Sequence, residues 1–161
     1  MIGVIGGASC NAEEYSIAEA VGELTASRGG IVLCGGGRGV MEAVCKGVKK
    51  AGGTTIGIMP GSTPMESPPN RFVDIPIFTG MSDGRNVINT KSSDVVIAIG
   101  GSFGTLSEIG LALKSGKRVI SINSWNINRD GVKMDNYLKV DSAEEAVELA
   151  FNLLKFHTSK A

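Results

Sequence analysis

The sequence has little of the chemistry on which many enzymes depend. Its only histidine, His157, lies in the last few residues, so a Ser-His-Asp triad, a Cys-His pair or a histidine-ligated metal has almost nothing to be built from. The three cysteines are odd in number and lack CxxC spacing, which argues against a disulfide framework and a structural zinc site. We therefore expect no metal site.

The sequence also lacks an excess of charge of either sign and any long apolar run. The 16 lysines and arginines balance the 16 aspartates and glutamates, so no overall field would draw the protein to nucleic acid. No apolar run approaches the roughly 20 residues of a membrane span, and Met1 leads directly into an apolar segment without a charged n-region and a cleavage site. We expect a cytoplasmic protein whose partner is a small molecule, with no nucleic acid and no membrane.

Glycine is the residue in excess, because it makes up 23 of the 161 residues, about twice its usual share of roughly 7%. The glycines fall in clusters, three of which follow short apolar segments, at 6–11, 35–39 and 100–105. Clustered glycine is typical of turns that a second backbone or a ligand must approach closely.

Apolar segments alternate with helical patterns along the whole chain. Strands are predicted at 1–6, 31–34, 54–59, 72–77, 95–99 and 118–122, of which 1–6 and 95–99 are expected to be buried. Helices are predicted at 11–28, between 39 and 52, at 82–92, at 105–114 and from 142 to about 156. The proline-rich segment at 60–71 is interpreted as a mobile flap, and 123–138 as a polar loop around Trp125.

This alternation predicts one Rossmann-like α/β domain over residues 1–161. Strands without polar alternation are typical of a parallel sheet with helices on both faces, and right-handed crossovers then give a doubly wound, three-layer fold. In such a sheet, all strand-to-helix turns lie at the C-terminal edge, so the three glycine-rich turns should share one rim.

That rim is suited to a phosphate group. Glycine lets the backbone come close, and the free N–H groups and dipole of the following helix favour negative charge. The helix at 82–92 should bring Arg85 near the turn at 100–105, because about nine helical residues nearly match five strand residues in length. Arg85 could hold a phosphate through two hydrogen bonds, and Glu108 could bind ribose hydroxyls or position a water.

Structural explanations exist for each of these features. The turn at 35–39 could serve only close helix packing, Arg85 could be a surface residue, and Glu108 could merely favour the helix dipole. Neither the GxGxxG fingerprint nor the P-loop pattern fits in register. A standard dinucleotide oxidoreductase and an NTPase are therefore not supported.

The glycine-rich turns carry the motifs of a known family. The turn at 6–9 matches an early Gly-Gly/Ser turn, 35–41 matches GGGxxGxM if one residue is dropped, and 100–108 aligns with PGGxGTxxE. Gly100 stands in place of the Pro of that signature, and Ser102 in place of its second Gly. The residues that fit the signature are Gly101, Gly104, Thr105 and Glu108. Over nearly its whole length the chain resembles the LOG-like (so-called lysine decarboxylase-like) family, specifically its short branch related to the molybdenum cofactor carrier proteins.

The resemblance implies roles for particular residues. The family's catalytic arginine lies nine residues before the Asp of a Ser-Asp dipeptide, and Arg85 keeps that spacing to Ser93-Asp94. Its neighbour is Asn86, where the phosphoribohydrolase branch has lysine, and this departure is similar to the carrier-type branch. Nothing in the sequence suggests a pyridoxal phosphate domain with a Schiff-base lysine, so lysine decarboxylase activity is not expected.

Two main functions follow from the residues and the resemblance. In the first, the protein binds a nucleotide or a pterin-type phosphate cofactor without turning it over. In the second, it resembles the phosphoribohydrolases that cleave the N-glycosidic bond of nucleoside 5′-monophosphates, with Arg85 and Glu108 as catalytic residues. A nucleotide-sensing interaction module is a third hypothesis. The substitutions in the signature and Asn86 favour binding.

No cofactor is required for either function, and AMP or a pterin cofactor is the kind of ligand expected. The residues expected to bind it are Gly7, Ser9, Gly35, Gly36, Gly37, Arg38, Gly39, Arg85, Asn86, Gly101, Ser102, Phe103, Gly104, Thr105 and Glu108. The helix at 105–114 carries more apolar surface than one sheet face can cover, which predicts a subunit contact. The resemblance likewise implies a homo-oligomer, a dimer or a tetramer.

Overall fold

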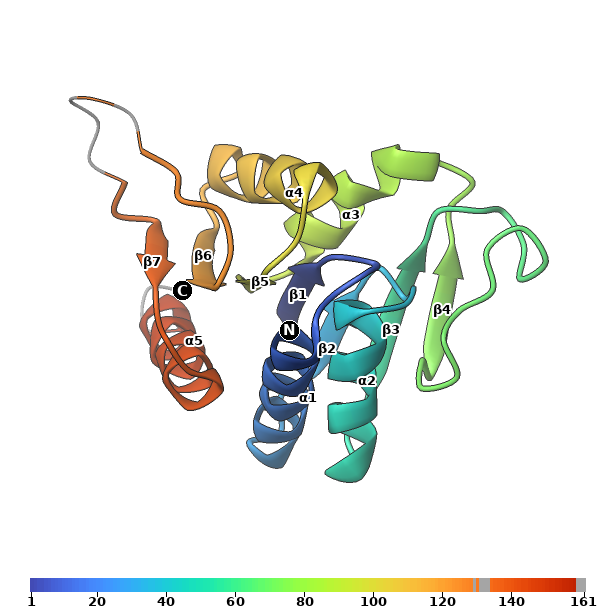
Figure 1. Ribbon diagram of the computed structural model, residues 1–161, viewed down its shortest axis with the longest axis horizontal. Helices are drawn as coiled ribbons and strands as arrows, with labels where there is room; N and C mark the ends of the chain where they lie inside the picture. The colour runs from blue at the N-terminus through green and yellow to red at the C-terminus, as the bar shows by residue number, and fades with distance from the viewer. Residues whose placement is uncertain (129, 131–133, 159–161) are drawn as a thin grey trace.

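A computed structural model describes residues 1–128, 130 and 134–158 of the chain (Figure 1). The remaining positions of the predicted domain, including part of the loop predicted at 123–138, lie outside the described residues. The strands are β1 (Ile2–Gly6), β2 (Val32–Cys34), β3 (Thr55–Met59), β4 (Ile75–Phe78), β5 (Val95–Ile99), β6 (Arg118–Ile122) and β7 (Tyr137–Lys139). The helices are α1 (Ala12–Ser27), α2 (Val40–Lys50), the 3-10 turn η1 (Ser82–Gly84), α3 (Arg85–Ser92), α4 (Phe103–Lys114) and α5 (Ala143–Thr158).

The seven strands form one parallel sheet in the order β4-β3-β2-β1-β5-β6-β7. Helices α1, α2 and α5 cover one face, and α3 and α4 cover the other (Figure 1). The predicted doubly wound α/β fold is therefore confirmed. The winding direction of the chain reverses between β1 and β5, which are neighbours at the centre of the sheet.

The central strands show why the sequence lacks polar alternation. Every residue of β5 is buried. Val95, Ile97 and Ile99 pack into the core under α1, α2 and α5, while Val96 and Ala98 pack into the core under α4. Both faces of the strand are thus covered by helices, as a parallel sheet requires.

The first helix begins at the predicted capping box. Glu14 N donates to Asn11 Oδ1 over 2.8 Å, and Asn11 N donates to the Glu14 carboxylate over 3.1 Å. These two bonds satisfy amide groups that a helix N-terminus otherwise leaves free. The start of α1 therefore has fewer amides to offer a ligand than an uncapped helix would.

Three predicted elements differ from the structure. The fourth strand, predicted at 72–77, spans Ile75–Phe78. Phe72 and Val73 lie before this strand and pack against the core, which accounts for their apolar side chains. The predicted helix at 82–92 opens with the 3-10 turn η1 before α3. The loop predicted at 123–138 runs into a short edge strand, β7, that begins at Tyr137 and was missed because three residues are too few to show a period.

The segment at 60–71 lies at the surface outside the core, in agreement with its proline content. Its far end is fixed by Asn70, whose side chain donates to the carbonyl oxygens of Gly36 and Gly37 over 3.1 and 2.8 Å. Its mobility remains a prediction.

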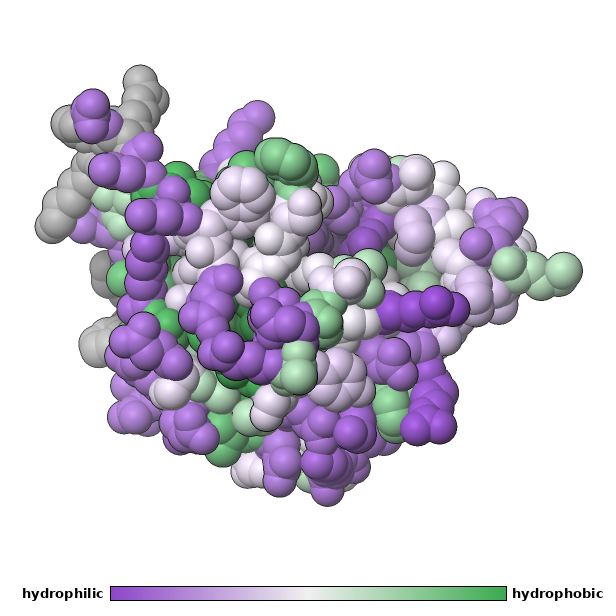
Figure 2. Space-filling model, in the orientation of Figure 1, coloured by the Kyte–Doolittle hydropathy of each residue, from purple (hydrophilic) through white to green (hydrophobic). Residues whose placement is uncertain are grey.

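The surface seen in Figure 2 differs in character from one region to another. In the view of Figure 2, hydrophilic side chains gather over the lower part of the molecule, where Figure 1 places α1 and α2. The surface over α4 and the turn between β5 and α4 is paler, which marks intermediate hydropathy. Small residues are exposed there, among them Gly101, Ser102 and Gly104. No helix among the described residues is long and apolar enough to cross a membrane.

Candidate functional site

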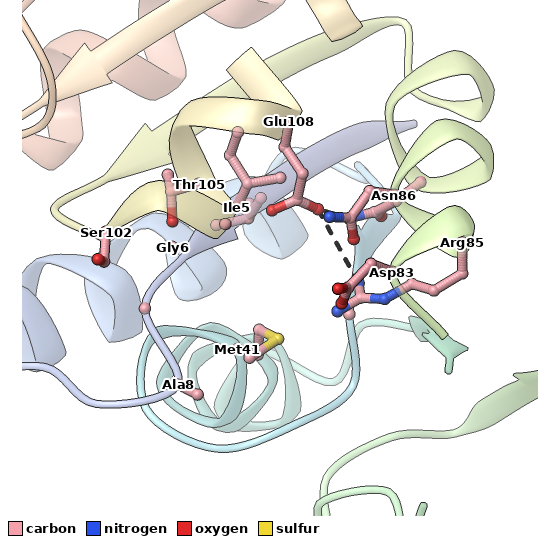
Figure 3. Close-up of a pocket in the computed structure, with 15 residues that line it drawn as sticks. Ile5, Gly6, Ala8, Met41, Asp83, Arg85, Asn86, Ser102, Thr105 and Glu108 are labelled. Carbon is pink, nitrogen blue, oxygen red and sulfur yellow. Dashed lines mark hydrogen bonds and ion pairs between the residues drawn. The ribbon is translucent and has the colours of Figure 1, made fainter. Parts of the chain in front are cut away.

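A cavity of about 210 Å³ lies beside the C-terminal ends of β1 and β5. One wall comes from β1 and the turn that follows it, and the opposite walls come from α3 and the start of α4 (Figure 3). This is the point where the winding of the sheet reverses, and ligands of open α/β sheets bind in the crevice at such a point.

The glycine-rich turns meet at this rim. A Cβ atom added to Gly7 would lie 3.7 Å from Gly101 Cα, so the turns after β1 and β5 are side by side. Gly39, with φ of 62°, lies against the turn after β1, because a Cβ atom added to Gly39 would lie 2.4 Å from Gly7 O. Val40 N also donates to Gly7 O over 3.0 Å. A side chain at Gly39 would therefore push its own turn away from the turn after β1.

Helix α4 begins without a side-chain cap. Its N-cap residue, Ser102, makes no capping hydrogen bond, and the first backbone amide that bonds back into the helix is that of Leu106, to Ser102 O. Gly100 and Gly101 reach positive φ values of 51° and 91° in the turn that leads into it. The start of α4 at the cavity is therefore an uncapped helix N-terminus, which favours an anion.

Arg85 enters the cavity from the start of α3. Its Nη1 atom lies 3.9 Å from Glu108 Oε1 (Figure 3), and its side chain is only 16% exposed. A Cβ atom on Gly35 would lie 2.3 Å from Arg85 Nη1, so only glycine at position 35 leaves room for the guanidinium. Arg85 Nε has no hydrogen-bond partner among the described residues, which leaves this donor available to a ligand.

Glu108 lies one turn into α4 and is 6% exposed. Asn89 Nδ2 donates to Glu108 Oε1 over 2.9 Å. Burial raises the pKa of the Glu108 carboxyl above its usual value, and the Asn89 hydrogen bond and the Arg85 charge oppose that rise. The cavity therefore holds a buried carboxyl group beside a guanidinium, a pairing that often marks a functional site.

About half of the residues that the sequence predicted line this cavity. They are Gly7, Gly35, Arg85, Asn86, Ser102, Gly104, Thr105 and Glu108. The others lie in or beside the same turns without lining it: Ser9, Gly36, Gly37, Arg38, Gly39, Gly101 and Phe103. Arg38 is exposed, and Phe103 is 75% exposed with its ring against Trp125, the ring centres 5.5 Å apart.

Sequence reasoning missed seven lining residues: Val4, Ile5, Gly6, Ala8, Met41, Asp83 and Asn89. Val4, Ile5 and Met41 belong to β1 and to the apolar stripe of α2, where burial alone explains an apolar residue. Gly6 and Ala8 lie in the glycine-rich turn at 6–11, which was predicted at the rim without these two residues as ligand contacts. Asn89 carried a usable signal, because it lies four residues after Arg85 and therefore on the same face of a helix. The hydrogen bond of Asn89 to Glu108 joins α3 to α4, and no pattern in the sequence predicted a contact between these two residues.

Comparison with known proteins agrees with this architecture. Residues 1–149 match the model of the SLOG cluster4 family. The molybdenum cofactor binding protein of Rippkaea orientalis is 38% identical, with a TM-score of 0.85 over 95% of this chain and 96% of that one. The molybdenum cofactor carrier protein of Chlamydomonas reinhardtii is 34% identical, with a TM-score of 0.82 over 96% of this chain and 97% of that one.

A relative with an enzymatic name is more distant. The cytokinin riboside 5′-monophosphate phosphoribohydrolase of Mycobacterium tuberculosis is 29% identical over 130 residues, which cover 76% of this chain and 69% of that protein.

Proposed function

The chain belongs to the SLOG cluster4 family, and on that premise we propose that it binds a phosphate-bearing small molecule, a nucleotide or a pterin-type cofactor, without turning it over. The observation that carries the proposal is the meeting of Arg85 and the uncapped start of α4 at one cavity. A guanidinium and a helix N-terminus that face a common space are suited to a phosphate group.

The size of the cavity supports a ligand that is held by one end. At about 210 Å³ it is smaller than the roughly 300 Å³ at which drug-sized pockets begin. A phosphosugar fits such a volume better than a whole nucleotide does, so part of a larger ligand would extend toward the open rim. The exposed ring of Phe103, beside the turn, offers an apolar surface there.

The two solved structures compared above support a carrier. Both are named for binding or carrying molybdenum cofactor, and each is more than 30% identical to this chain. The differences of this sequence from the phosphoribohydrolase pattern, Gly100, Ser102 and Asn86, favour the same choice. Gly100 and Ser102 change the signature turn. Asn86 follows Arg85 where the phosphoribohydrolase branch has a lysine.

A second candidate function is phosphoribohydrolase activity. It is favoured by the Arg85–Glu108 arrangement and by the 29% identical relative named for this reaction. Arg85 would hold the 5′-phosphate, and the Glu108 carboxylate would stabilise positive charge that develops on the ribose as the bond to the base breaks. Nothing in the cavity favours lysine decarboxylation, because none of its lining residues is a lysine.

Thermal melting with millimolar AMP, ribose 5-phosphate and pyrophosphate tests the binding proposal. A ligand at 100 times its Kd stabilises the folded state by about 2.7 kcal/mol. Trp125 provides a second readout, because it is the only tryptophan and its indole N–H donates to Ser102 O at the cavity over 3.1 Å. The proposal is wrong if no phosphate-bearing ligand changes either signal.

Product analysis separates the two candidate functions. The protein is incubated with AMP and related monophosphates for hours, and free base and ribose 5-phosphate are measured beside a Glu108→Gln control. A carrier releases neither product. Release that is abolished in Glu108→Gln, while AMP binding is largely kept, would establish the hydrolase instead.

A further inference from the structure

The buried end of the cavity, beside Asn86, Asn89 and Glu108, has hydrogen-bond acceptors that no other described residue uses. Asn86 and Asn89 line the cavity and are 8% and 1% exposed. The Oδ1 atom of each has no hydrogen-bond partner among the described residues. A buried carbonyl oxygen is costly unless water or a ligand donates to it.

The orientation of the Asn89 amide is fixed by its neighbour. Because the Glu108 carboxylate only accepts hydrogen bonds, the Asn89 atom that lies 2.9 Å from Glu108 Oε1 must be its Nδ2. Asn89 Oδ1 is therefore the amide atom that has no partner in the described part of the chain. Asn89 thus does two things: it holds the carboxylate in place, and it adds an acceptor to the same wall.

These groups define what can occupy the buried end. Two amide oxygens and a carboxylate repel a phosphate, so a phosphate is expected at the other end, beside Ser102 and the start of α4. The buried end suits an uncharged group with two or more N–H or O–H donors. Arg85 lines the same cavity and provides the positive charge that both the phosphate and Glu108 require.

We infer that Asn86, Asn89 and Glu108 form a donor-recognition subsite, which selects the uncharged, donor-bearing part of a phosphate ligand and so fixes the direction in which the ligand binds. The inference rests on the proposed function, because it concerns the same cavity. Two ligand parts share this chemistry: the vicinal diol of a ribose and the amino-bearing edge of a purine or pterin ring.

Two matched ligand pairs distinguish these sources by calorimetric titration. Ribose 5-phosphate and 2-deoxyribose 5-phosphate differ only in one hydroxyl, and GMP and IMP differ only in the 2-amino group. Because losing a buried hydrogen bond costs about tenfold in affinity or more, the donor-bearing member of one pair should bind at least about tenfold more tightly. The pair that shows the preference identifies the group at the buried end.

Three variants assign the preference to this wall. Asn89→Leu and Asn86→Leu replace each amide by an apolar side chain of similar size, and the second leaves the Asn89–Glu108 bond intact in case the first is unstable. Thr90→Val is the matched control, because the Thr90 hydroxyl is buried on the same helix and bonds only to the carbonyl oxygens of Asn86 and Val87. A loss of stability alone would not change the ratio of the affinities for the two ligands of a pair.

The expected result is that the parent and Thr90→Val keep the preference, while at least one asparagine variant loses about tenfold of it. If all four phosphate ligands bind but neither pair is discriminated, or if both asparagine variants keep the preference, the subsite is wrong and the proposed function stands. If none of the four ligands binds, both the subsite and the proposed function are wrong.

Discussion

Arg85 Nη1 lies 3.9 Å from Glu108 Oε1, in a cavity that both side chains line. This separation is longer than the 2.7–2.9 Å or so of a charge-assisted hydrogen bond. The two charges therefore attract each other without using up the donors of the guanidinium. Arg85 can bond to a phosphate while it remains close to the opposite charge of Glu108.

Replacing Arg85 by methionine should weaken phosphate binding. Hydrogen bonds to charged groups contribute about 1.5–3 kcal/mol, so we expect Arg85→Met to lower the affinity for AMP or ribose 5-phosphate by at least about tenfold. Lys91→Met is the matched control, because Lys91 is exposed on the same helix and does not line the cavity. Equal affinities for the two variants in calorimetric titration would argue against a role for Arg85.

Glu108 should make the stability of the protein depend on pH. Burial raises its pKa in the folded state above the ordinary value of 4.5, so the folded protein holds this proton more tightly than the unfolded chain does. The stability that Glu108 contributes is therefore fully present below pH 4.5 and is lost as the pH rises through the folded-state pKa.

Denaturant unfolding of the parent and Glu108→Gln over a pH series measures this contribution. The difference in unfolding free energy, parent minus variant, should decrease as the pH rises above 4.5. A difference that is constant or increases with pH would mean that the folded-state pKa is not raised.

Gly39→Ala should destabilise the fold more than an alanine at Gly116, because Gly39 has φ of 62° and ψ of −126°, a conformation that is nearly confined to glycine, and is also tightly packed. A Cβ atom at Gly39 would meet the Gly7 carbonyl oxygen at 2.4 Å, whereas at Gly116, with φ of 73°, it would meet nothing within 4 Å. We expect Gly116→Ala to cost about 1 kcal/mol from backbone strain alone. Gly39→Ala should cost about 3 kcal/mol or more, because the turn after β1 must also move. Chemical denaturation compares them, and similar losses would show that these turns are not tightly packed.

The sequence predicted the sheet, the helices and the shared rim well, because these depend on local patterns. The uninterrupted apolar run of β5 requires helices on both faces, and the Asn11–Glu14 spacing predicts the start of α1 to within a residue. The interior of the cavity was harder to predict. Spacing alone placed Arg85 near the turn at 100–105, but its contact with Gly35 depends on how α3 packs across the sheet. The Asn89–Glu108 bond likewise joins two separate helices.

The outer side of α4 is the surface that we propose for a subunit contact. Ser107 and Gly110 are exposed on it, and Leu111 is half-buried. Nothing lies within 4 Å of a Cβ atom added at Gly110, so Gly110→Glu fits the isolated subunit and favours the helix. A charge at a subunit contact should nevertheless separate the subunits.

Light scattering after gel filtration tests this contact. We expect the parent to elute as a dimer or tetramer and Gly110→Glu to elute as a smaller species. Asn152→Glu, an exposed position of α5 on the other helix layer, should leave the assembly unchanged. A monomeric parent, or a Gly110→Glu variant of unchanged size, would contradict the proposal.

The central claim is that a phosphate-bearing ligand binds where the winding of the sheet reverses, between Arg85 and the start of α4. A titration of the ¹⁵N-labelled protein with AMP, followed by NMR, tests it most directly because it locates the ligand residue by residue. We predict that the largest amide shifts fall at 6–8, at Gly35 and at 102–105, and that Arg85→Met weakens them. Saturating AMP that shifts no amide, or shifts centred on β7 and α5, would contradict the account.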